Sequence, residues 1–277
     1  MTIRETKRSL SRNEAAIVLD LEWRGARLVS LADLRKLLRA SPAYSRFMAH
    51  RLVQKGWLQR LRRGVYRLVP ADRGREGVGD TNPLIAGIFL KKPFFYSYGT
   101  ACSHHGLTRQ AFTEFAVACR ERRRPAISQG IRYVFIHQPE SRFFGFELVK
   151  ILGETYPMAT RERAMLDALD HPELAGGIGE VSLILAKGLK SCRWPVMLDA
   201  LKRWRQSSMV QRLGYFARLH GIAVRPSVLR ELRSLMRPNV KIHLGPRARW
   251  GTRGALDADW NVLVNVPLEV LREGGMP

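Results

Sequence analysis

The residues whose types and spacing could support catalysis are acidic side chains and histidines beyond residue 100. Asp167 and Asp170 lie three positions apart on a predicted helix, and Glu162 is close by in the sequence. Two carboxylates on one helix face can share acid–base work or hold a divalent ion. Arg161 and Arg163, however, offer ion-pair partners to these carboxylates. We therefore expect a structural role for them.

Two further arrangements lack the partners that metal chemistry needs. The adjacent residues His104 and His105 point to different sides of a helix, and no carboxylate or cysteine lies at ligand spacing. Asp257 and Asp259 flank a predicted strand that no Glu-x-Lys follows, as a nuclease-like site would require. The phosphate-loop pattern GxxxxGK[ST] and the hydrolase pattern GxSxG are absent. We predict no catalytic residue, no metal and no cofactor, and the chain is not expected to be an enzyme.

Basic residues carry the stronger signal. The 277 residues include 47 Lys and Arg against 24 Asp and Glu, which gives a net charge of +23. Residues 1–70 hold 16 of the basic and 5 of the acidic residues, and no acidic residue occurs between Asp33 and Asp72. Such an excess favours a polyanionic partner, above all nucleic acid, over a merely solvated surface.

The elements that must position these charges are three short helices. Residues 11–24 have a helical apolar pattern that stops at Gly25. Ser30 precedes LADLRKLL with Asp33 three positions on, which is a variant of the capping box. Ser41, followed by proline, starts a third helix that Gly56 ends. About three residues separate the second and third helices, as in a helix-turn-helix.

A basic hairpin is predicted next. The strand-like runs WLQRL and VYRLV surround Arg62, Arg63 and Gly64, and glycine at this position allows a tight turn. Three helices followed by a basic hairpin describe a winged helix-turn-helix.

The DNA contacts expected from this unit divide between helix and wing. The apolar residues of the third helix, including Phe47, are expected to face the core. The residues then left to meet base edges in the major groove are Ser45, Arg46, Ala49 and His50. The arginines expected at phosphates or in a minor groove are Arg60, Arg62, Arg63 and Arg67. The alternatives are unengaged surface charges for the arginines and a structural role for His50.

The sequence predicts an α+β protein with two domains. Residues 1–70 form the winged helix-turn-helix, residues 71–82 a Gly- and Pro-rich linker, and residues 83–277 a larger mixed α/β domain. In this larger domain the expected helices cover residues 84–90, 97–105, 160–172, 180–190, 196–205 and 209–220, and the expected strands cover 115–119, 131–137, 240–244 and 260–266.

Two basic segments of the larger domain suggest a second polyanion surface. The first is RERRR, with Arg122, Arg123 and Arg124, and the second is RARWGTRG, with Arg247, Arg249 and Arg253 around Trp250. These segments could bind DNA, RNA or an acidic partner, or they could be solvated loops.

The remaining features point to a cytoplasmic protein without membrane contact. No apolar run reaches the ~20 residues of a membrane helix, and the basic N-terminus lacks a signal-peptide core. The three widely spaced cysteines, Cys102, Cys119 and Cys192, are expected to be reduced thiols.

The ordered motifs resemble those of the AbiEi-type antitoxins of type IV toxin–antitoxin and abortive-infection systems. The resemblance is carried by LADLRKLL, LVQKGWLQRLRRGVYRLV, YSYGTACSHHGL, ATRERAMLDALDHPELAGGIGEV, QRLGYFARLHG and DWNVLVNVPL. It implies an N-terminal winged helix that binds inverted repeats upstream of its own operon. It also implies that residues 83–277 form an AbiEi-like antitoxin domain, which takes part in neutralising a nucleotidyltransferase-fold toxin.

Three functional hypotheses follow. The first is a sequence-specific DNA-binding transcriptional autorepressor that is also an antitoxin. The second is a protein-binding module that neutralises a toxin by direct contact, or a regulator without any toxin. The third is a nuclease-type enzyme that uses the carboxylates of the larger domain.

Overall fold

The structure is a computed structural model that describes residues 8–71, 84–86, 89–90, 93–128, 130–151 and 154–274. Contacts divide the chain into two compact units. Unit 1 comprises Met1–Phe89 with Ile127–Gly130, and unit 2 comprises Leu90–Ala126 with Ile131–Pro277. The predicted linker at 71–82 lies outside the described residues except for Ala71.

The three predicted helices of unit 1 are confirmed, and local capping explains where they start. The Ser11 amide donates to Glu14 Oε2 at 2.7 Å. Ser30 Oγ accepts from the Asp33 amide at 3.1 Å, and the Ser30 amide donates to the Asp33 carboxylate at 2.9 Å. Ser41 Oγ accepts a hydrogen bond from the Tyr44 amide of the third helix at 3.2 Å. The helices are α1 (Arg12–Trp23), α2 (Leu31–Leu38) and α3 (Pro42–Gln54).

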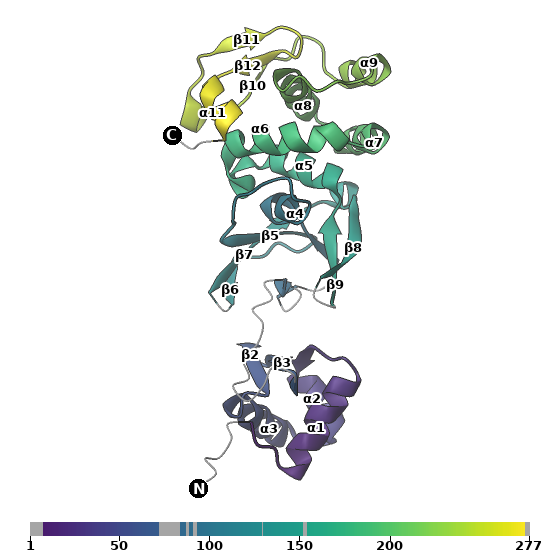
Figure 1. The fold of residues 1–277 in the computed structure, drawn as a ribbon, viewed down its shortest axis with the longest axis vertical. Coiled ribbons are helices and arrows are strands. Elements are labelled where there is room, and N and C mark those ends of the chain that lie inside the picture. Colours follow the sequence, from purple (N-terminus) through teal and green to yellow (C-terminus); the bar gives the residue numbers. More distant parts are fainter. Residues whose placement is uncertain are drawn as a thin grey trace. The chain divides into compact units, whose positions relative to one another are not determined.

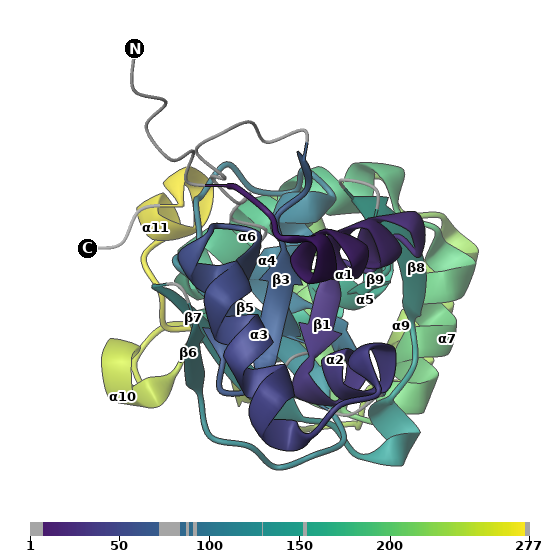
Figure 2. The ribbon, with the colours of Figure 1, turned by 90° about the horizontal axis from the view of Figure 1, so that it is seen from below.

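A three-stranded antiparallel sheet completes unit 1. The predicted hairpin forms, and Gly64 turns it with φ of 76°. A third strand, which the sequence analysis did not predict, adds to its edge, with Leu28 opposite Arg67. The strands are β1 (Leu28–Ser30), β2 (Leu58–Arg62) and β3 (Val65–Leu68), in the order β1-β3-β2. Figure 2 shows the three helices beside β1 and β3.

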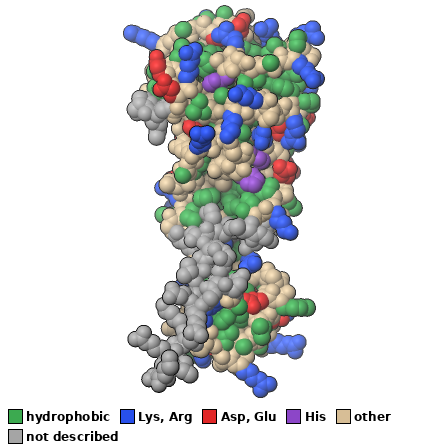
Figure 3. All heavy atoms as spheres, in the orientation of Figure 1, with side chains coloured by type: hydrophobic (Ala, Val, Ile, Leu, Met, Phe, Trp, Pro, Cys, Tyr) green, Lys and Arg blue, Asp and Glu red, His purple; other side chains and the backbone are tan. Residues whose placement is uncertain are grey.

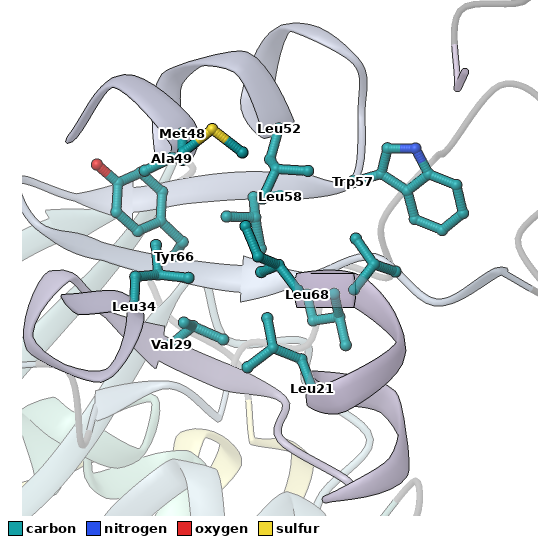
Figure 4. Packing of buried hydrophobic residues seen from close by; sticks show 12 residues of the cluster. Leu21, Val29, Leu34, Met48, Ala49, Leu52, Trp57, Leu58, Tyr66 and Leu68 are labelled. Atoms are coloured by element: carbon teal, nitrogen blue, oxygen red, sulfur yellow. The ribbon is translucent and has the colours of Figure 1, made fainter. Parts of the chain in front are cut away.

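The core of unit 1 lies between these helices and the sheet. Leu34 of α2 and Leu52 of α3 are fully buried in one apolar cluster with Leu58 and Leu68 of the sheet. Figure 4 shows these side chains converging from both layers. Because every element contributes to one cluster, the packing fixes which face of each helix remains outside.

Residues 94–159 form a six-stranded mixed sheet, ordered β6-β7-β5-β4-β9-β8. β4 runs antiparallel to β5 and parallel to β9, whereas β5 and β7 are parallel. The strands are β4 (Phe94–Tyr96), β5 (Glu114–Cys119), β6 (Ala126–Ser128), β7 (Ile131–His137), β8 (Phe146–Ile151) and β9 (Glu154–Ala159). The predicted strands at 115–119 and 131–137 are thus confirmed.

Helices separate this sheet from a smaller one, ordered β10-β12-β11, as Figure 1 shows. Mixed α+β architecture is therefore confirmed.

The predicted helix at 84–90 is wrong, because residues 84–86 and 89–90 belong to no α-helix; residues 87–88 lie outside the described residues. The remaining elements are α4 (Tyr98–His104), α5 (Arg161–Asp170), α6 (Gly177–Gly188), α7 (Trp194–Trp204), α8 (Ser207–Leu219), α9 (Pro226–Ser234), β10 (Ile242–His243), α10 (Arg247–Trp250), β11 (Ala255–Asp257), β12 (Val262–Val264) and α11 (Leu268–Glu273), with short 3-10 turns at Glu140–Arg142, Pro172–Ala175 and Leu189–Ser191.

Two further features concern cysteines and membranes. Cys102, Cys119 and Cys192 are all free, as their number and spacing predicted, and burial raises the pKa of Cys192 to about 12. Among the described helices, none combines the length and the apolar character that spanning a bilayer requires.

Candidate nucleic-acid interface

The outward face of α3 differs from the predicted one. Ser45 and Ala49 are 1% and 0% exposed, so the expectation that they project toward a DNA groove is wrong. They share the buried face with Met48 and Leu52, at i, i+3, i+4 and i+7 spacing, and Figure 4 shows Met48, Ala49 and Leu52 directed inward. The Ser45 hydroxyl can be buried because it donates to the Ser41 carbonyl at 3.0 Å.

The side chains that do project from α3 form a mixed face. Arg46 and His50 are exposed, as predicted, and Phe47 is exposed between them although it was expected in the core. The sequence missed this exposure because Ser45 and Ala49, two small residues, take the places in the core that larger apolar residues were expected to fill. We define the outward face of α3 as Ala43, Arg46, Phe47, His50 and Gln54, all of them exposed.

Three of the four wing arginines are exposed. Arg60, Arg62 and Arg63 lie on β2 and at the turn of the hairpin. Arg67, by contrast, is only 5% exposed, so its predicted place at the DNA is wrong. Arg67 lies on β3, the central strand between β1 and β2, with Leu28 and Gln59 as its cross-strand neighbours.

An ion cluster anchors α3 against α1. Glu14 is fully buried, and its two carboxylate oxygens lie 2.9 Å from Arg51 Nε and 2.7 Å from Lys55 Nζ. Burial raises the pKa of Glu14, but hydrogen bonds from Lys55 and Ser11 outweigh it and lower the pKa from 4.5 to about 2. Arg51 and Lys55 are therefore engaged in positioning α3, whereas Arg46, Arg60, Arg62 and Arg63 form no ion pair with another described residue.

Comparisons with known proteins found a family match for part of the chain and a likeness in fold. Residues 17–69 match the family model described as "Transcriptional regulator, AbiEi antitoxin". This segment, the AbiEi-type segment below, runs from within α1 to just after β3, so the resemblance found in the sequence is confirmed here. The later motifs lie beyond the match.

A solved structure extends the likeness in fold alone. The RV2827C protein from Mycobacterium tuberculosis superposes with a TM-score of 0.67 at 15% identity, over 98% of this chain and 97% of that chain. The comparison with curated proteins found no match. The two units thus follow a known arrangement of elements, while the family match covers the AbiEi-type segment only.

Outside the AbiEi-type segment, the two predicted basic segments are exposed but attached to different sheets. Arg122, Arg123 and Arg124 follow β5 of the larger sheet. The second group lies in and after α10, between β10 and β11 of the smaller sheet, and consists of Arg247, Arg249 and Arg253. Figure 3 shows Lys and Arg side chains spread over the visible face rather than gathered in one place.

The carboxylates considered for catalysis are held in structural contacts. Asp167 is fully buried, and its Oδ2 accepts from Ser97 Oγ and, at 2.8 Å, from Arg163 Nε. Burial raises the pKa of Asp167, more than Arg163 and Ser97 lower it. Arg163 also donates to the backbone carbonyls of Arg142 and Phe144. The pair therefore joins α5 to the segment before β8.

The other residues considered for metal binding are also held in protein contacts. His105 Nε2 lies 2.7 Å from the Ala159 carbonyl, and its ring meets His104 edge to face. Asp257 and Asp259 both pair with Arg218. Among the described residues, no three His, Cys, Asp or Glu side chains gather as metal ligands would.

Proposed function

We propose that this chain is a sequence-specific DNA-binding transcriptional repressor that regulates its own operon and acts as an antitoxin toward a nucleotidyltransferase-fold toxin. It works in the cytoplasm as a non-enzymatic protein without a cofactor. The observation that carries the proposal is that the outward face of α3 and the wing arginines are both exposed, on a segment that matches an antitoxin and regulator family.

The charge distribution supports duplex DNA as the ligand. Neither α3 nor the hairpin contains an acidic residue, and the exposed cations Arg46, Arg60, Arg62 and Arg63 form no ion pair within the part of the chain that the structure describes. A helix with mixed polar and apolar side chains suits base edges in the major groove, and a basic hairpin suits phosphates.

Titration against two DNA duplexes tests the DNA half of the proposal. The full chain is titrated with the DNA upstream of its own gene and with a scrambled duplex of equal composition, at several salt concentrations. Specific binding predicts an affinity for the upstream DNA roughly 10³-fold or more above that for the scrambled duplex at physiological salt. Equal affinities would overturn the claim of a sequence-specific repressor.

The antitoxin half rests on the family match and is tested separately. Co-expression with the product of the neighbouring gene should relieve that product's toxicity. Capture of the toxin by this chain would favour neutralisation by direct contact, whereas relief without capture would favour repression. A neighbouring gene without a nucleotidyltransferase fold would leave a regulator without this toxin.

A further inference from the structure

An aromatic pair on α3 lies outside the described core cluster of unit 1. Phe47 is 52% exposed and Tyr44 is 39% exposed, and their ring centroids lie 6.2 Å apart. Phe47 belongs to the outward face of α3 with Arg46 and His50. Exposing such rings to water gives up the stabilisation that burial would provide. Phe47, with Tyr44 beside it, therefore supplies an apolar contact surface at the face proposed to meet DNA.

The surroundings of the aromatic pair are cationic. The Arg51 guanidinium lies 5.7 Å from the centre of the Phe47 ring and is itself held by Glu14. Arg46 is the neighbouring residue on the same face, and no acidic residue occurs on α3. The partner that complements this surface presents an apolar group surrounded by negative charge.

Duplex DNA offers one such group in its major groove. The 5-methyl group of thymine is the apolar feature that distinguishes an A·T pair there, and phosphates line the groove on both sides. We infer that Phe47, flanked by Tyr44, contacts thymine 5-methyl groups and is a specificity-determining residue of the DNA site. This inference rests on the proposed function, because it assigns α3 to the major groove.

The expected effect of losing one methyl contact is moderate. Burial of one methylene-sized group corresponds to an affinity change of about three- to fivefold. Replacing thymine by deoxyuridine removes only this methyl and leaves the hydrogen-bonding edge of the base unchanged. The substitution therefore isolates the contact that Phe47 is inferred to make.

The experiment uses the full chain and duplexes selected by it from a randomised library. The selected sequence is resynthesised with deoxyuridine at each thymine in turn, and Kd is measured for wild type, Phe47→Ala and Phe47→Leu. Trp23→Ala is the matched control, because Trp23 is an aromatic residue on α1 that is 87% exposed. Thermal unfolding of each variant checks that it folds.

Wild type should lose about three- to fivefold in affinity at one or two particular thymines. Phe47→Ala should bind the thymine and deoxyuridine duplexes equally, Phe47→Leu should keep part of the preference, and Trp23→Ala should keep all of it. Specific binding that ignores deoxyuridine throughout would overturn the inference but not the proposed function. A Phe47→Ala variant that keeps the thymine preference would also overturn the inference alone. So would the finding that Phe47 contacts a protein partner instead of DNA. Failure to select any sequence would overturn both.

Discussion

At the scale of single residues, burial decides which arginines of the winged helix are available to contact DNA. Arg62 and Arg67 both lie on the hairpin, yet Arg62 is exposed on β2 and Arg67 is buried on the central strand β3. Arg51 is held by Glu14, whereas Arg46, on the same helix, faces outward. Equal chemistry in the sequence thus leads to different roles in the fold.

Arg46 and Arg62 should respond differently to removal. Arg46→Ala is expected to weaken binding to the upstream DNA by about 1–3 kcal/mol and binding to random DNA less, because the side chain lies on the outward face of α3, which we propose contacts the bases. Arg62→Ala should weaken both duplexes alike and reduce the salt slope by about one. Quantitative gel-shift titrations of the two variants with both duplexes measure this division. Identical behaviour of the two variants would contradict it.

At the scale of elements, buried charged groups hold helices in place in each unit. Glu14 joins α1 to Arg51 and Lys55 near the end of α3, and the Arg163–Asp167 pair connects α5 to the backbone before β8. In both cases the group is buried, so the loss of a partner leaves charge or hydrogen-bonding capacity unsatisfied.

Stability of α3 should depend on pH through Glu14. Its pKa is about 2 in the folded chain against an ordinary 4.5, so its stabilising effect is complete above pH 4.5 and is lost as the pH falls toward 2. Between these values the opening free energy of α3, measured by hydrogen exchange, should fall by roughly 2–3 kcal/mol more in wild type than in Glu14→Gln.

The matched control for this prediction is Asp20→Asn. Asp20 pairs with Arg24 on the surface of α1, where such a pair contributes less than about 1 kcal/mol. This variant should keep the acid-dependent loss seen in wild type. If Glu14→Gln also keeps it, Glu14 is not the responsible group.

In unit 2, Arg163→Met should destabilise the fold by about 3–5 kcal/mol, because it leaves Asp167 buried without its cation. Chemical denaturation measures the change. Arg132→Met is the comparison, since Arg132 pairs with Glu114 on the exposed side of β5 and β7 and should cost less than about 1 kcal/mol. Adding Asp167→Asn to Arg163→Met should recover part of the loss. If Arg163→Met and Arg132→Met lower the free energy of unfolding by similar amounts, the structural role of Arg163 is contradicted.

At the scale of the whole molecule, positive charge extends well beyond the winged helix. Residues 71–277 carry 31 Lys and Arg against 19 Asp and Glu, and Figure 3 shows basic side chains over the visible face of both units. The exposed segments at Arg122–Arg124 and Arg247–Arg253 lie next to strands of different sheets. Net charge alone therefore does not show how much of the surface meets DNA.

The salt dependence of DNA binding measures how much of the basic surface contacts phosphates. Four exposed arginines, Arg46, Arg60, Arg62 and Arg63, should give a slope of log K against log salt of roughly −3 to −4. A slope of roughly −5 to −9 would instead mean that basic segments of unit 2 also contact phosphates. Replacing Arg122, Arg123 and Arg124 together by Ala should leave the smaller slope unchanged. A reduced slope in that variant would assign these residues to the interface.

The sequence by itself determined the features that depend on neighbouring residues. Ser30 with Asp33 started α2, Ser41 started α3, and Gly64 allowed the turn between β2 and β3. The absence of acidic residues from Asp33 to Asp72 already favoured a polyanionic partner. These signals act within a few residues of the chain, so they can be recognised without knowing the fold.

Only the tertiary structure decided which side chains face outward. Ser45 and Ala49 are buried and Phe47 is exposed because α3 packs against the core through the face that also carries Met48 and Leu52. Arg67 is buried on the central strand between Leu28 and Gln59, and Asp167 accepts a hydrogen bond from Ser97, 70 residues earlier in the chain. Each outcome depends on partners from other elements, often distant in sequence, and local patterns contain no information about such contacts.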